Sequence, residues 1–294
     1  MLPLGLVAAL ERLLEAYCQT SGTITSTTNL SGGCINRAAK ITYEGQDFFV
    51  KWNHNPMLNG LMEAEAAGLQ ILSSANAVKT PQLIGSGFAN GIQYLVLGYI
   101  DQRRPTGDFW KNFGEQLAQL HQNSAASFGL SQSNYIGSLV QSNRCWPTWP
   151  DFFKHERLQP LITVATKERL IDAALQKLFD RLFERFDQLF PSEKPALLHG
   201  DLWSGNYLCN RENQPVLIDP AVYYGYREMD LAMTRLFGGF PQSFYEAYDH
   251  YFPLEKDWQQ RIDLCNLYPL LVHAILFGES YIGQICQNLQ YLLR

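Results

Sequence analysis

The stretch LLHGDLWSGNYL, residues 197–208, constrains the structure of this chain more than any other part of it. An apolar run breaks at His199, Gly200 and Asp201, and resumes after Asn206, five positions beyond Asp201. Buried strands end in turns, and a turn accounts for the glycine. A turn does not account for an acid and an amide at this separation, so Asp201 and Asn206 are candidates for a catalytic or metal-binding role.

A third polar residue, Asp219, ends the apolar run PVLID, eighteen positions after Asp201. NYLCN and PVLID are typical of the two arms of a β-hairpin, and folding that hairpin returns Asp219 to Asn206. One carboxylate and one amide oxygen suit Mg²⁺, a hard cation that prefers oxygen ligands. Asp201 is then left to accept a proton from an attacking hydroxyl, as phosphoryl transfer requires. The alternative is three turn-favouring residues that flank strands.

The rest of the chain predicts two lobes. Residues 20–100 have the pattern of a sheet with one inserted helix: strand-like runs flank turns at Glu44-Gly45 and Asn90-Gly91, and LMEAEAAGLQILSS is helical in composition. An amphipathic helix precedes them. After residue 100 the chain is mainly helical around the one β-rich segment described above. We therefore expect an α+β fold with lobes at residues 1–100 and 101–294 and a cleft between them.

Composition narrows the class of protein. A hydrophobic content of 46% in 294 residues supports a large core, and a net charge of −5 argues against a nucleic-acid-binding surface. The six cysteines form no CxxC pair, which favours reduced thiols in the cytoplasm over a disulfide framework or a zinc site. The longest uncharged stretch near the C-terminus is too short to span a bilayer, so we expect no membrane partner.

The pattern HGDxxxxN, followed by an aspartate at the end of an apolar strand, resembles the catalytic and metal-binding loops of the protein-kinase-like superfamily. That resemblance requires a phosphate-binding lysine on an N-terminal strand and a glutamate on the next helix. DFFVKW supplies Lys51, and MEAEAAGL supplies Glu65, with Glu63 as the competing choice. For each residue alone, the more common case is an exposed side chain, a lysine on an edge strand or a glutamate on the surface of a helix. Their presence together in the required order favours the functional interpretation.

Two other segments are candidates for nucleotide binding. SGGCIN precedes the strand-like run AAKITYEG, where a kinase covers the nucleotide phosphates, although Gly32 and Gly33 serve a tight turn equally well. LVLGYID lies where the lobes join, so the backbone at Leu97 and Tyr99 is a candidate for contact with the adenine edge. A buried strand is the alternative for this second segment.

HGDLWSGN, IDPAVYYGYREMDLAM and LFGGF together resemble the fructosamine kinase (ketosamine 3-kinase) family, which is related to aminoglycoside phosphotransferases. The likeness extends over nearly the whole chain, through SGGCIN, FVKW, WPTWPDFF and LYPLL…LFGESY. It implies the bilobed protein-kinase-like fold and ATP- and Mg²⁺-dependent phosphorylation of the sugar 3-hydroxyl of ketosamines, free or on glycated lysines of proteins. The phosphorylated adduct is unstable, so the implied activity repairs glycation.

The resemblance also implies residue roles. Asp201 is the expected base, Asn206 and Asp219 the metal ligands, and Lys51 with Glu65 the pair that positions the phosphates. Asp230, in REMDLAM, is similar to the helix aspartate that braces the catalytic loop in kinase folds; an ordinary charged residue on an amphipathic helix is the alternative.

Trp203 and Tyr223 are candidate walls of the sugar pocket because they lie near these loops in the sequence, and aromatic core is the alternative for both. Cys34 lies on the glycine-containing loop, and similar kinases carry a cysteine there that is associated with redox control. We expect its oxidation to inhibit reversibly, through a disulfide-linked homodimer; the alternative is a small packed residue.

Two other hypotheses compete with a ketosamine kinase. One is a kinase for another hydroxylated metabolite or an aminoglycoside, against which Trp203 and its surrounding motifs speak. The other is a catalytically silent nucleotide-binding module. The presence of Lys51, Asp201, Asn206 and Asp219 in one chain speaks against the silent module.

Overall fold

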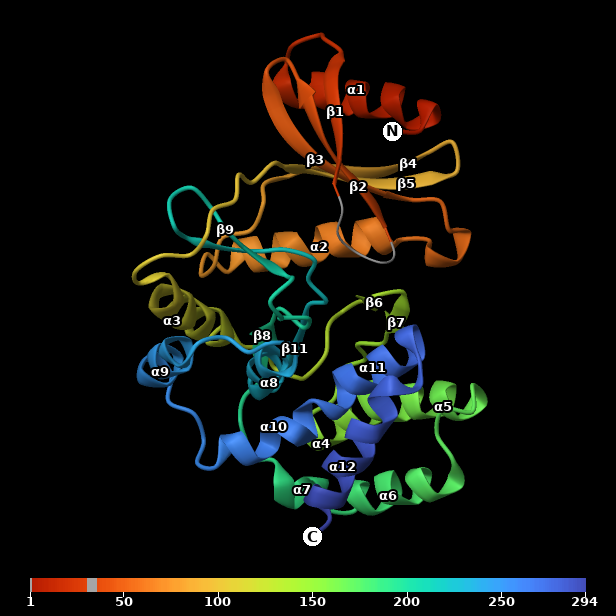
Figure 1. Cartoon of the computed structure of the whole chain (residues 1–294), viewed down its shortest axis with the longest axis vertical. Helices are drawn as coiled ribbons and strands as arrows, with labels where there is room; N and C mark the ends of the chain where they lie inside the picture. Colours follow the sequence, from red (N-terminus) through yellow and green to blue (C-terminus); the bar gives the residue numbers. More distant parts are fainter. Residues whose placement is uncertain (1, 31–35) are drawn as a thin grey trace.

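The structure, a computed structural model, describes residues 2–30 and 36–294 and has two lobes, one above the other in Figure 1. The N-terminal lobe, coloured red to yellow, holds an antiparallel sheet and two helices, and the larger C-terminal lobe is mainly helical. This is the α+β, bilobed arrangement that the sequence predicts. Within the described ranges, the chain has no helix with the length and apolar character needed to cross a membrane.

The described part of the N-terminal lobe contains a five-stranded sheet in the order β1-β2-β3-β5-β4. The elements of this lobe are α1 Leu4–Cys18, β1 Ile24–Leu30, β2 Arg37–Tyr43, β3 Gln46–Asn53, the 3₁₀ turn η1 Pro56–Leu58, α2 Leu61–Ser74, β4 Leu83–Ala89 and β5 Ile92–Gly98. Both predicted turns are present. Glu44, Gly45, Asn90 and Gly91 all have positive φ, which tight two-residue hairpin turns with a right-handed strand twist require.

The pleat of β3 decides which side chains face which helix. Phe48, Val50 and Trp52 point to the face covered by α1 and are at most 2% exposed. Lys51 points to the opposite face, because successive residues of a strand alternate. That face is covered by α2, so Lys51 meets Glu65.

Strand β1 is the one strand of this sheet that the sequence does not predict. Its sequence, ITSTTNL, is polar, and residues 25–29 are all exposed. It pairs with β2 at the edge of the sheet, where both faces meet solvent. An edge strand of this kind buries no face, so it leaves no alternation of apolar residues in the sequence.

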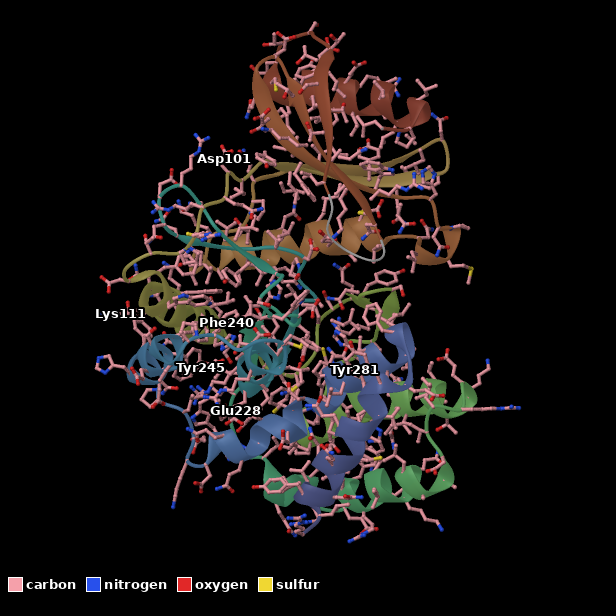
Figure 2. The ribbon with its side chains drawn as sticks, in the orientation of Figure 1. Asp101, Lys111, Glu228, Phe240, Tyr245 and Tyr281 are labelled. Carbon is pink, nitrogen blue, oxygen red and sulfur yellow. The ribbon has the colours of Figure 1, made fainter. Side chains whose placement is uncertain are left out.

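The C-terminal lobe packs helices around three short strand pairs. Its helices are α3 Phe109–His121, α4 Trp149–Phe152, the π-helical η2 Phe153–Leu158, α5 Gln159–Lys167, α6 Ala173–Phe183, α7 Phe186–Leu189, α8 Glu228–Leu236, α9 Gln242–Tyr251, η3 Trp258–Arg261, α10 Ile262–Cys265, α11 Leu267–Phe277, η4 Glu279–Tyr281 and α12 Ile282–Leu292. The strand pairs are β6 Asn134–Ile136 with β7 Leu139–Gln141, β8 Ala196–Leu198 with β11 Tyr223–Gly225, and β9 Tyr207–Cys209 with β10 Pro215–Leu217. Phe240 and Tyr245, labelled in Figure 2, belong to the apolar cluster that joins α3 to α9.

The β9–β10 hairpin connects the two lobes. The amide of Leu217, on β10, donates to the carbonyl of Lys79 in the N-terminal lobe at 2.8 Å. The connector that follows β5 is bound to the same hairpin, because the amide of Arg103 donates to the carbonyl of Cys209 at 2.9 Å. The hairpin is therefore bound both to the N-terminal lobe and to the connector between the lobes.

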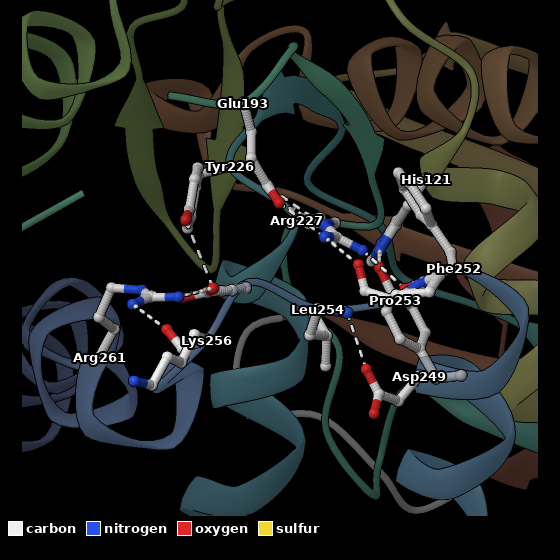
Figure 3. Close-up of polar contacts among 12 residues, drawn as sticks. His121, Glu193, Tyr226, Arg227, Asp249, Phe252, Pro253, Leu254, Lys256 and Arg261 are labelled. Atoms are coloured by element: carbon white, nitrogen blue, oxygen red, sulfur yellow. Dashed lines mark hydrogen bonds and ion pairs between the residues drawn. The ribbon is translucent and has the colours of Figure 1, made fainter. Parts of the chain in front are cut away.

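Two ion pairs fix the beginning of α8, which carries Asp230. Figure 3 labels Arg227 and Glu193, which form the first pair, and Arg261 of the second. Arg227 Nη2 lies 2.6 Å from Glu193 Oε1, and Arg261 Nη2 lies 2.6 Å from Glu228 Oε1. Both pairs are largely buried, so breaking either one would leave an uncompensated charge in the protein interior. The start of α8 is thereby held in one position.

Candidate active site

The loop of residues 199–206 begins where β8 ends. Gly200 has a φ of +83°, and a Cβ at this position would lie 2.1 Å from the carbonyl oxygen of Ala221. Only glycine therefore fits here, for reasons of both conformation and space. Leu202 is fully buried and anchors the loop, and Asp201 beside it lines the cavity described below.

His199 is buried and links this loop to the segment that contains Asp219. Its Nε2–H donates to the carbonyl of Ile218 at 2.9 Å, and its Nδ1 accepts from the amide of Asp201 at 3.2 Å. One nitrogen donates and the other accepts, which is the pattern of a neutral imidazole. Burial lowers the pKa of His199, in agreement with that pattern.

Asp230, on α8, binds the same loop through its carboxylate. Its carboxylate accepts from the amides of His199 at 2.7 Å and Gly200 at 2.9 Å, and lies 3.2 Å from His121 Nε2. Burial by itself would raise the pKa of Asp230, but the hydrogen bond from His121 and its charge outweigh burial, and the pKa is lowered. An ionised carboxylate therefore holds two successive backbone amides just before Asp201.

The β9–β10 hairpin brings Asn206 next to the segment that carries Asp219, as the sequence predicts. Tyr207 pairs with Leu217, and one step further the amide of Ile218 donates to the carbonyl of Asn206 at 3.1 Å. Asn206 Nδ2 donates to the carbonyl oxygen and to Oδ2 of Asp201, at 2.8 Å and 3.0 Å. These bonds fix the orientation of the amide and leave Asn206 Oδ1 available to a cation.

The side-chain oxygens of Asn206 and Asp219 are suitable ligands for Mg²⁺. Asn206 offers an amide oxygen, and Asp219 offers a carboxylate whose side chain is 45% exposed and lines the cavity. Among the residues that the structure describes, no group of three or more His, Cys, Asp or Glu side chains is arranged to hold a metal ion. Mg²⁺ keeps several water or phosphate ligands and needs only one or two protein side chains, so this pair is sufficient.

Lys51 lies between the two lobes and is paired with both. Its Nζ lies 2.8 Å from Glu65 Oε2 and 3.0 Å from Asp219 Oδ1. Burial would lower the pKa of Lys51, but the two carboxylates raise it, so the lysine stays charged. Glu65, rather than Glu63, is thus the residue of α2 that contacts Lys51.

Asp201 has the electrostatic environment of a proton acceptor. Burial and the negative charge of Asp219 raise its pKa to about 7, against the lowering effect of the Asn206 hydrogen bond. A carboxylate with a pKa near neutrality holds a proton more readily than an ordinary aspartate does, which favours proton transfer from a hydroxyl. Perturbed carboxylates of this kind are concentrated at functional sites.

These side chains converge on one cavity of about 590 Å³ between the lobes. Lys51, Glu65, Asp201, Asn206 and Asp219 all line it. The site residues thus come from β3, α2, the 199–206 loop and the end of the β9–β10 hairpin.

One wall of the cavity, on the C-terminal lobe, contains five aromatic residues and is called the aromatic wall below: Trp203, Phe237, His273, Phe277 and Tyr281. Trp203 packs edge-on against Phe237, with ring centroids 6.1 Å apart. Phe237 in turn contacts His273, which also touches Phe277 and Tyr281. Tyr281, labelled in Figure 2, follows the C-terminal end of α11.

The sequence alone predicts no role for four of these aromatic residues: Phe237, His273, Phe277 and Tyr281. They belong to LFGGF and LYPLL…LFGESY, motifs that carry the family resemblance. Because they lie far from HGD in the sequence, only the fold brings them to Trp203. The motifs themselves were the signal that could have identified them.

The prediction that Tyr223 forms a wall of the sugar pocket is wrong. Tyr223 is 1% exposed, and its ring stacks on Phe152 within the core of the C-terminal lobe. It lies on β11 opposite Leu198, and its side chain points away from the cavity. Proximity in sequence to Asp219 was misleading because the chain has already turned into the core.

Two other predicted residues that the structure describes, Leu97 and Tyr99, do not line the cavity. Leu97 is buried between β3 and β4, and Tyr99 lies under the ammonium group of Lys40, so neither side chain lines the cavity. Their proposed contact with adenine was a backbone contact and stays a prediction. Gly32, Gly33 and Cys34 lie outside the described residues.

The two-lobed fold is shared with a solved spectinomycin phosphotransferase, APH(9)-Ia, in complex with ADP and spectinomycin. The TM-score is 0.59 over 97% of this chain and 93% of that one, at 15% identity, a likeness that bears on the fold alone. The fold is that of the protein-kinase-like phosphotransferases, and the relatives described next show a phosphotransferase that acts on a hydroxyl group.

The chain belongs to the fructosamine kinase family, whose sequence profile matches residues 6–294. A Synechocystis sp. protein named probable ketoamine kinase is 37% identical, over 100% of this chain and 100% of its own length. A crystal structure from Thermobifida fusca, provisionally named a fructosamine-3-kinase, superimposes with a TM-score of 0.89 at 33% identity, covering 99% of this chain and 100% of the other. The family resemblance seen in the sequence is therefore confirmed.

Proposed function

We propose that this protein is an ATP-dependent kinase that phosphorylates the sugar 3-hydroxyl of ketosamines of the fructosamine or ribulosamine type, and so contributes to deglycation. The observation that carries the proposal is the convergence of Lys51, Glu65, Asp201, Asn206 and Asp219 on one cavity in a member of the fructosamine kinase family. Both small ketosamines and glycated lysines on proteins are candidate substrates.

In this proposal each polar side chain has one task. Lys51, held by Glu65, binds the ATP phosphates, and Asp201 accepts the proton of the attacking hydroxyl. Asn206 Oδ1 and the Asp219 carboxylate would hold Mg²⁺, which neutralises the charge of the phosphates when bound. Asp230 keeps the loop in place through the amides of His199 and Gly200.

We further propose that the aromatic wall receives the ketosamine. His273 Nδ1 donates to the carbonyl of Pro269 at 2.7 Å, and burial lowers the pKa of this histidine, so its Nε2 is an acceptor. A sugar hydroxyl supplies the donor that such a nitrogen needs. The face of Trp203, which is 37% exposed, suits the apolar face of a sugar or the cationic amine of the substrate.

A panel assay tests this proposal directly. ATP consumption is measured with fructosamine, ribulosamine, choline and an aminoglycoside as acceptors, each with and without Mg²⁺. We expect Mg²⁺-dependent turnover with the ketosamines. Turnover with only choline or the aminoglycoside would overturn the ketosamine assignment, and ATP binding without any turnover would favour a silent nucleotide-binding module.

Two further proposals concern the cellular compartment of the enzyme and its inhibition by oxidation. We place it in the cytoplasm, because the spacing of its six cysteines is not that of a disulfide framework and the five that the structure describes are free. We also propose that oxidation of Cys34 inhibits the enzyme reversibly by linking two chains. A Cys34→Ala variant should stay active and lose its sensitivity to peroxide; undiminished sensitivity would refute the role of this thiol.

A further inference from the structure

A short hairpin, β6–β7, lies between the lobes and beside the segment that carries Asp219. In Figure 1 it is below α2 and next to α11. The hydroxyl of Tyr135 donates to the carbonyl of Asn59 at 2.8 Å, which joins this hairpin to the N-terminal lobe just before α2. Residues 134–137 also line the cavity. The hairpin is thus in contact with both lobes and with the site.

Two buried amide side chains of this hairpin bind the backbone just after Asp219. Asn134 Nδ2 donates to the carbonyl of Val222 at 2.8 Å, and Gln141 Nε2 donates to the carbonyl of Ala221 at 3.1 Å. Gln141 Nε2 also donates to Asn134 Oδ1 at 2.7 Å. Asn134 is 7% exposed and Gln141 is 2% exposed, so water does not compete for these bonds.

Neighbouring donors determine which way the two amides point. The hydroxyl of Tyr268 donates to Gln141 Oε1 at 2.6 Å, and Asn143 Nδ2 donates to Asn134 Oδ1 at 3.0 Å. Because both side-chain oxygens already receive donors, the amide NH₂ groups are directed at the backbone carbonyls after Asp219. The side-chain amides of Asn134 and Gln141 therefore each have one orientation.

Arg157 fixes the base of the hairpin. Its guanidinium is fully buried and lies 3.9 Å from the ring centroid of Tyr223. Nη2 donates to Asn143 Oδ1 at 2.7 Å, and Nη1 donates to the carbonyl of Ser142. A planar guanidinium stacked on an aromatic ring is a rigid support for the residues that it binds.

The other side of the same segment is bound to the 199–206 loop. The amide of Ala221 donates to the carbonyl of His199, and the side chain of His199 donates to the carbonyl of Ile218. Asp219, between these two contacts, has a φ of +53°, a conformation that L-residues other than Asn and Asp seldom adopt. Contacts on both sides are what keep a residue in such a conformation.

We infer that Asn134 and Gln141 are positioning residues, which hold the segment after Asp219 so that its carboxylate is correctly placed for Mg²⁺ and ATP. The inference depends on the proposed function for the role of Asp219. Gln141 is not among the described residues that line the cavity, so a change there removes no contact with a bound ligand and acts on the site through the residues that Gln141 binds.

The test uses Gln141→Met and Asn134→Leu, which remove the donors and keep the approximate size of the side chain. Asn288→Leu is the matched control: Asn288 is also 7% exposed, and its Nδ2 donates to the carbonyl of Asp263, far from the site in the sequence. The two variants remove different donors, and Asn134→Leu leaves the bond between Tyr268 and Gln141 in place. One variant is therefore sufficient for the test if the other does not fold.

The first measurement is hydrogen exchange of the peptide 218–224 in the full chain without metal or nucleotide. We expect this peptide to exchange at least about tenfold faster in both variants than in wild type, and unchanged in the control. The second measurement is the Mg²⁺ concentration that half-saturates ATP binding, which should rise about fivefold or more in the variants alone. Unchanged exchange, or faster exchange with unchanged Mg²⁺ dependence, would overturn the positioning role.

The two proposals fail in different ways. Wild-type protein that binds ATP without any dependence on Mg²⁺ would contradict the proposed role of Asp219, and with it the positioning role. Mg²⁺-dependent binding in the wild type, with no response in either variant, would contradict the positioning role alone.

Discussion

Gly200→Ala should damage catalysis more than it damages the fold, and the structure gives the size of both effects. The new Cβ would lie 2.1 Å from the carbonyl oxygen of Ala221, whereas ordinary contacts begin at 3.4 Å. The two segments must therefore move apart by about 1 Å. They carry Asp201 and Asp219, and a misplacement of about 1 Å in a catalytic site costs roughly 10²-fold in rate.

The cost to stability has two parts. A left-handed conformation at a residue with a Cβ costs about 1–2 kcal/mol. Overpacking against a backbone oxygen adds about 1–3 kcal/mol. Gly45→Ala isolates the first part, because Gly45 has a φ of +76° and nothing lies within 4 Å of its Cβ position.

The assay is therefore kcat together with thermal unfolding for both variants. We expect Gly45→Ala to unfold at a slightly lower Tm with kcat unchanged, and Gly200→Ala to lose roughly 10²-fold in kcat while still folding. The reasoning is refuted if Gly200→Ala matches Gly45→Ala in both Tm and kcat, since the segments would then have absorbed the methyl group without moving.

Four further substitutions test the roles assigned above. Asp201→Asn should keep nucleotide binding and lose roughly 10²–10⁴-fold in kcat, so a loss well below that range would argue against a general base. Asp219→Ala should raise the Mg²⁺ concentration needed for ATP binding, and an unchanged requirement would contradict its role as a metal ligand. Lys51→Met should raise the KM for ATP much more than that for the ketosamine, because Lys51 is assigned to the phosphates; equal increases would remove that assignment. Asp230→Asn should lower the free energy of unfolding by roughly 2–4 kcal/mol at pH 7. Because the pKa of Asp230 is lowered in the folded state, its contribution to the free energy of unfolding is fully present above the ordinary pKa of 3.8. It is lost as the pH falls through the folded-state pKa. A loss of stability in the variant that does not change with pH would contradict the role of an ionised carboxylate.

The polar centre of the site was predictable because it is encoded locally. Asp201, Asn206 and Asp219 lie within one short stretch, and a single hairpin brings them together. Lys51 and Glu65 were found because the pleat of a strand and the helix that follows it are also local patterns. Their meeting with Asp219 required only that the two lobes face each other.

What the sequence did not predict depends on contacts between distant segments. The β6–β7 hairpin has strands of three residues, too short to show a period, and its buried amides have no signature without their partners. The aromatic wall is assembled from Phe237, about thirty positions after Trp203, and from residues of α11 and η4, about seventy positions after it. Tyr223 was misassigned for the converse reason, since closeness in sequence does not place a side chain on the same face.

The bonds of the N-terminal lobe and of its connector to the β9–β10 hairpin would set the axis about which the lobes open. Lys79 and Arg103 are the points at which the N-terminal lobe and its connector are bound to this hairpin, and together they define an axis. Tilting the N-terminal lobe about that axis moves the distant edge of its sheet most and the groups near the hairpin least. Asn206, at the start of the hairpin, would stay with the C-terminal lobe throughout such a motion. Nucleotide exchange would then require a tilt of the N-terminal lobe while Asn206 keeps its position in the C-terminal lobe.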